Sequence, residues 1–157
     1  MNSSELIKLV PPDDEIYCSS LGRGSLIRGK IQITWDTHLI CSIKGLYYRR
    51  YVRKTKKSED VFVPWKEVED LKDEMIFIRG YGMEILFIRC LPGEKKSQWK
   101  KRVAEFNKIT FPYLINGKKN YLDYIKTNQN DSTTYNPKIE RKMLKEIAKH
   151  EKKYSKL

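Results

Sequence analysis

The sequence predicts a mainly β domain, a small seven-stranded barrel or sandwich closed by one amphipathic helix. About seven short segments with strand-like patterning run from Glu15 to Cys90, and turn residues separate them. A single amphipathic helix then begins near Ser97 and carries Trp99 on its apolar face. The chain has 157 residues, 39% of them apolar, which suits one core with room for a tail.

The strands follow a weakly apolar lead-in, residues 1–14. Its Pro11 and Pro12 stop regular structure before the first strand. We expect turns at Gly22–Arg23–Gly24, at 35–36, at 44–45 and at 80–82, because Gly and polar residues interrupt the apolar pattern there. Residues 53–59 read as a polar loop, and 66–72 as one helical turn. The expected strands are 15–21, 26–34, 37–42, 46–52, 60–65, 75–79 and 83–90.

The helix after the strands has Trp99, Val103, Phe106 and Thr110 on one face. Ser97 is the expected N-cap, and Pro112 is expected to limit the helix. The barrel domain therefore spans 15–109, and the apolar segment 110–126 forms a docked extension with a short second helix. Residues 127–137 read as a polar linker, and 138–157 as a basic amphipathic tail helix.

The charge balance favours anionic partners. The 32 basic and 20 acidic residues give a net charge of +12, which suits phospholipid headgroups, nucleic acid or acidic protein faces. The three Cys are an odd number in strand-like runs, which indicates reduced thiols in a cytoplasmic protein. We see neither a secretory signal nor an apolar run of about 18 residues that could span a membrane.

The residue inventory argues against an enzyme. The two His residues, His38 and His150, form no zinc-ligand spacing with the scattered Cys. Gly22–Arg23–Gly24 lies between strands and does not open a helix, so it is not a nucleotide-phosphate loop. No nucleophile and base can be paired by position. We expect a non-catalytic binding module that uses no cofactor and no metal.

Two stretches resemble a known family. Residues 35–47, from Trp35 to Tyr47, resemble the strand–turn–strand core of GRAM-like and bacterial pleckstrin-homology-like (PH-like) domains. Residues 62–68 (Phe-Val-Pro-Trp-Lys-Glu-Val) resemble the step that follows that core. The resemblance covers 15–109 and implies the PH superfold, a seven-stranded barrel or sandwich capped by one helix.

Within that superfold, the chain resembles the GLUE domains of ESCRT-II subunits. Residues 138–143 (Lys-Ile-Glu-Arg-Lys-Met), placed after a linker, are similar to the segment that follows such domains. This resemblance implies a sorting adaptor that binds ubiquitin or another small protein, phosphoinositide membrane, or both, with other ESCRT subunits as partners. It also implies peripheral attachment to a membrane. The winged-helix domains that follow a GLUE domain do not occur in this sequence.

A basic cluster marks the predicted site for anionic headgroups. Seven basic residues and no acidic residue occur between Lys44 and Lys57. Strand alternation places Arg49 and Arg50 on opposite faces, so only one of them can point outward with the loop. Arg is suited to phosphate through its bidentate fork. The predicted anion-binding residues are Arg23, Arg28, Lys30, Arg49, Arg53, Lys54, Lys56 and Lys57; the alternative is a hairpin tip kept soluble by its charges.

The segment 75–88 is apolar on both strand faces, so one face is left for a partner or for cover by 111–125. The predicted protein-binding residues are Ile76, Ile78, Tyr81 and Met83. The rival interpretation is a basic nucleic-acid-binding domain, in which exposed aromatic residues would stack on bases. Against it, the order of elements matches none of the common nucleic-acid-binding folds.

Overall fold

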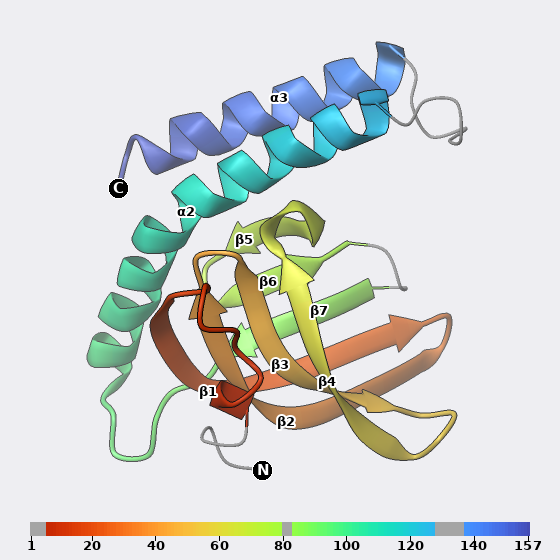
Figure 1. Cartoon of the computed structure of the whole chain (residues 1–157). Helices are drawn as coiled ribbons and strands as arrows, with labels where there is room; N and C mark the ends of the chain where they lie inside the picture. The colour runs from red at the N-terminus through yellow and green to blue at the C-terminus, as the bar shows by residue number, and fades with distance from the viewer. Residues whose placement is uncertain (1–5, 80–82, 128–136) are drawn as a thin grey trace.

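The computed structural model describes residues 6–79, 83–127 and 137–157. Its centre is one seven-stranded antiparallel sheet with the strand order β4-β3-β2-β1-β7-β6-β5, which curls into a half-barrel (Figure 1). Two helices follow the strands. The strands are β1 (Ile16–Arg28), β2 (Ile31–Ser42), β3 (Gly45–Val52), β4 (Lys57–Pro64), β5 (Val68–Lys72), β6 (Met75–Ile78) and β7 (Met83–Ile88).

The first two strands are longer than expected. The turn predicted at Gly22–Arg23–Gly24 is wrong, because β1 runs through it and pairs with β2 on one side and β7 on the other. Both glycines make room for side chains of β2. A Cβ on Gly24 would lie 2.2 Å from the Trp35 ring, and one on Gly22 would lie 2.6 Å from Leu39. These glycines therefore serve packing.

The predicted number of strands is right, but two of its assignments are corrected. The three expected segments between residues 15 and 42 form only two strands. The expected helical turn at 66–72 is instead a short 3-10 helix, η1 (Trp65–Glu67), followed by strand β5. The buried residues Val68 and Leu71 contribute to the core from this strand, which its charged neighbours obscure in the sequence.

Helix α2 (Lys96–Thr127) closes the half-barrel (Figure 1). It is one helix, so the expected break at Pro112 is wrong. Proline removes one helical hydrogen bond, but Phe111 and Leu114 on either side of it are 1% and 0% exposed and pack into the barrel core. Burial of these side chains outweighs the local cost of proline.

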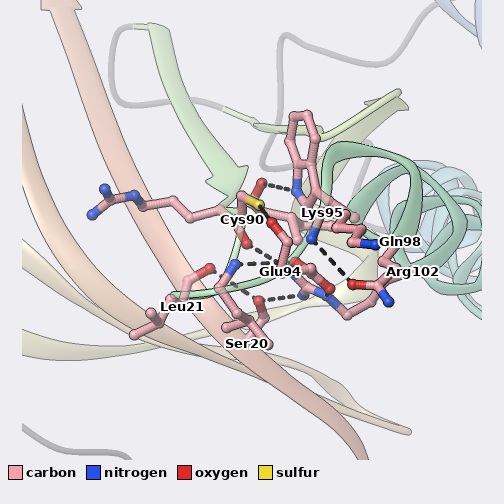
Figure 2. A network of polar contacts seen from close by, with 11 residues as sticks. Ser20, Leu21, Cys90, Glu94, Lys95, Gln98 and Arg102 are labelled. Atoms are coloured by element: carbon pink, nitrogen blue, oxygen red, sulfur yellow. Dashed lines mark hydrogen bonds and ion pairs between the residues drawn. The ribbon is translucent and has the colours of Figure 1, made fainter.

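A polar network fixes the start of α2 to the barrel (Figure 2). Arg102 donates to both carboxylate oxygens of Glu94, each at 2.9 Å, and to Ser20 Oγ at 2.7 Å on β1. The side chain of Gln98 accepts a hydrogen bond from the backbone N–H of Lys95, in the manner of a capping box. The helix begins at Lys96, so Ser97 is not the N-cap.

Helix α3 (Pro137–Tyr154) packs against the second half of α2 (Figure 1). Its apolar face contributes Met143 to a cluster with Leu122 and Ile125 of α2. The expected amphipathic tail helix is therefore present and is docked. In the part of the chain that the structure describes, neither helix is long and apolar enough to cross a membrane.

Candidate anion-binding site

Strands β2 and β3 separate toward one end of the half-barrel. They pair only at Ile40–Tyr47 and Cys41–Leu46, near the turn that joins them. Further along, side chains replace the ladder: Trp35 Nε1 donates to the Arg49 carbonyl oxygen at 2.6 Å, and the Arg49 N–H donates to Thr37 Oγ1 at 2.8 Å. Beyond these bonds the two strands leave a gap.

This gap ends at what we call the open end, defined by the β1–β2 turn (29–30) and the β3–β4 turn (53–56). Both hairpin tips point to the same side of the molecule, at the right of Figure 1. A pocket of about 490 Å³ lies between them. Its lining is apolar at Leu26, Ile31, Ile33 and Val52 and basic at Arg28, Arg50, Arg53 and Lys54; Tyr51 completes it.

One residue of the pocket lining, Arg50, belongs to a buried ion pair. Arg50 donates from Nε and Nη2 to the Glu84 carboxylate at 2.6 and 2.7 Å, and from Nη2 to the Tyr48 hydroxyl at 2.9 Å. Tyr48 also donates to Glu84. The side chains of Arg50 and Glu84 are only 15% and 1% exposed. Burial, and then the Glu84 charge, raise the pKa of Tyr48 above its ordinary value, so its hydroxyl stays a donor.

The rim of the pocket carries the cations suited to an anion. Arg53 and Lys54 are exposed in the β3–β4 turn, and within the described ranges neither makes an ion pair. Arg28 lies across the pocket from them at the end of β1. Arginine and lysine at a concave, partly apolar opening are a combination that binds phosphate or carboxylate groups.

The eight predicted anion-binding residues divide into three groups. Arg28, Arg53 and Lys54 line the pocket. The others near the open end lie in or beside its two turns; they are Lys30, Lys56 and Lys57. The structure does not bring Arg23 and Arg49 to the pocket: Arg23 pairs with Asp36 at 3.6 Å, and Arg49 pairs with Asp60 at 3.1 Å.

Two of the four predicted protein-binding residues are corrected. Ile76 and Ile78 are 0% and 6% exposed and belong to the barrel core, because their alternation on β6 turns them inward. Their side chains are therefore not offered to a partner. Met83 is 55% exposed at the start of β7, and Tyr81 lies outside the described residues.

Sequence reasoning missed Arg50, Glu84 and the apolar wall. Two signals were available. Arg50 and Tyr48 share one face of β3 with the buried Leu46, so Arg50 had to point inward. Glu84 is the one acid within the apolar run 83–88, and a buried acid needs a cationic partner.

The strand order, the curl of the sheet and the helix after the last strand define the PH-like fold, as predicted. No protein-family model and no curated protein matches the chain. Among solved structures, the chain is similar to the hSac2 domain from the human phosphoinositide phosphatase Sac2. That match has 18% identity and a TM-score of 0.41, and it covers 68% of this chain and 76% of the other. A match this distant carries no information about ligand or residues.

Proposed function

We propose that this chain is a non-catalytic module that binds the phosphate group of an anionic lipid headgroup at the open end of its barrel. One observation carries the proposal: Arg28, Arg53 and Lys54 surround a single pocket where two hairpin tips meet. The net charge of +12 adds long-range attraction to a negative membrane surface. Within the described residues no group of His, Cys, Asp and Glu could hold a metal ion. We place the protein on the cytoplasmic face of a membrane as a peripheral component.

The test is sedimentation with phosphatidylcholine vesicles that contain or lack a phosphoinositide. The test variant reverses two rim charges, Arg53→Glu with Lys54→Glu. The matched control reverses two exposed lysines at the start of α2, Lys100→Glu with Lys101→Glu, so both proteins lose the same net charge. The start of α2 lies on the opposite side of the molecule from the open end (Figure 1).

We expect the rim variant to lose at least about 30-fold in affinity, since each cation near an anionic surface contributes about 1 kcal/mol. The control should lose much less, because its lysines lie away from the contact. Equal losses in both variants would show that only net charge matters, and the site assignment would fail.

A second candidate function, nucleic-acid binding, is supported by the charges of α3. Its three acids pair with α2: Glu140 with Lys126 at 2.5 Å, Glu146 with Lys118 at 3.6 Å, and Glu151 with Lys119 at 3.2 Å. The exposed face is left with a row of cations, which are Lys138, Arg141, Lys142, Lys145, Lys149 and Lys152. Competition between vesicles and duplex RNA for the labelled protein separates the two candidates.

The GLUE-type role, with ubiquitin and ESCRT subunits as partners, stays a prediction from resemblance. Burial of Ile76 and Ile78 leaves Met83 as the described apolar residue of the surface that was predicted for ubiquitin. We therefore base the proposal on the anionic headgroup alone.

A further inference from the structure

The pocket at the open end has an unusual division of charge and apolar surface. Its rim is cationic through Arg53 and Lys54, and both side chains are exposed. Its inner cation, Arg50, is already held by both oxygens of Glu84. A phosphate placed beside Arg50 would therefore meet a carboxylate of like charge close by. The inner part of the pocket does not favour an anion.

The wall of the pocket is suited to hydrocarbon. Leu26 is 7% exposed, and Ile33 and Val52 are half-buried around the gap between β2 and β3. Ile31 is 45% exposed at the mouth, although it stands next to a basic rim. A large apolar side chain left open to water within a concave site is typical of a surface that an apolar ligand covers.

From this arrangement we propose, building on the function proposed above, that the ligand is an amphiphile with a phosphate head and an apolar chain. The phosphate lies on Arg53 and Lys54 at the rim. The first part of the chain enters the gap between β2 and β3 and covers Ile31 and Ile33. The module thus recognises the junction of head and chain, and a free headgroup satisfies only half of the site.

The test uses a homologous series of monoalkyl phosphates, from methyl phosphate to octyl phosphate, each kept below its micelle concentration, with affinity measured by titration calorimetry. Each methylene moved from water into the pocket should strengthen binding about fourfold until the gap is filled, after which affinity should level off. An alkyl ammonium of the same length is the control for non-specific adsorption, and it should not bind.

A pair of matched variants locates the chain. Ile31→Ser removes the exposed isoleucine of the pocket mouth. Ile43→Ser removes an isoleucine of similar exposure, 41%, beside the β2–β3 turn at the other end of the strands. Neither side chain is buried, so both variants should fold. We expect Ile31→Ser to weaken octyl phosphate at least about fourfold, the value of one methylene, and to leave methyl phosphate unchanged. Ile43→Ser should affect neither.

The outcomes separate this inference from the proposed function. If the affinity for alkyl phosphates does not depend on chain length but is lost in the rim variant, the amphiphile proposal is wrong and the headgroup site is kept. If Ile31→Ser does not reduce the effect of alkyl chain length, the alkyl chain binds elsewhere and the amphiphile proposal is wrong. If the protein sediments with phosphoinositide vesicles but binds no alkyl phosphate, the amphiphile proposal is also wrong. Loss of vesicle binding in rim and control variants alike would remove the proposed function itself.

Discussion

The ion pair between Arg50 and Glu84 gives the sharpest prediction about stability. Replacing Glu84 with Gln keeps the shape of the side chain and removes its charge. Two hydrogen bonds from Arg50, at 2.6 and 2.7 Å, would lose their charged acceptor, and Tyr48 would lose a strong one. Arg50 would remain 15% exposed without its counter-charge at close range.

Removing one partner of a buried ion pair typically costs about 3–5 kcal/mol. The lower end applies here, about 3 kcal/mol, because Arg50 keeps some contact with water and Glu59 lies 3.8 Å away. For a chain of this length each kcal/mol lowers the melting temperature by roughly 2–4 °C. Thermal unfolding followed by circular dichroism should therefore show a melting temperature lower by roughly 6–12 °C. Urea unfolding should show the loss of about 3 kcal/mol in the free energy of unfolding.

The control is Glu105→Gln on the exposed side of α2, which should stay within about 0.5 kcal/mol of the parent. A double variant, Arg50→Leu with Glu84→Leu, should recover much of the loss, because removing both charges leaves neither ion buried alone. The reasoning is refuted if Glu84→Gln has the same melting temperature as the parent. It is also refuted if the double variant loses as much stability as Arg50→Leu and Glu84→Leu lose together when each is measured alone.

Two further predictions concern the frame around the site. Hydrogen bonds from Arg102, and then from the Leu91 N–H, lower the pKa of Glu94 from 4.5 to about 2. A lowered carboxyl pKa adds stability above pH 4.5 that is lost as pH falls toward 2, so the stability gap between the parent and Glu94→Gln should close over that range in urea unfolding. A gap that is constant with pH would contradict this. Gly24→Ala should cost about 1–3 kcal/mol, since its Cβ would enter the Trp35 ring. A thermal melt equal to the parent's would disprove that contact.

The sequence predicted the fold well where the local residue pattern agrees with the tertiary packing. It failed where packing overrides the local signal. Short apolar runs bounded by turn residues located β3, β6 and β7 well. The prediction failed at Gly24, where glycine normally signals a turn but here admits the Trp35 ring. It also failed at Pro112, where the helix continues because burial of the neighbouring side chains outweighs the local cost of proline.

The candidate site was predicted in part for similar reasons. Cations at hairpin tips, such as Arg53 and Lys54, can be placed from turn positions alone. The role of Arg50 could not be placed so easily, because its partner Glu84 lies 34 residues away in the chain. The apolar wall depends on the separation of β2 from β3, which no local pattern in either strand records.

The central claim is that the open end of the barrel is the ligand site. It is tested most directly by amide chemical shifts of the labelled protein during titration with a soluble short-chain phosphoinositide at moderate salt. The account predicts saturable shifts centred on Arg28, Tyr51, Arg53 and Lys54, with α3 unchanged. Shifts confined to the exposed cations of α3, or no shifts at all, would contradict it.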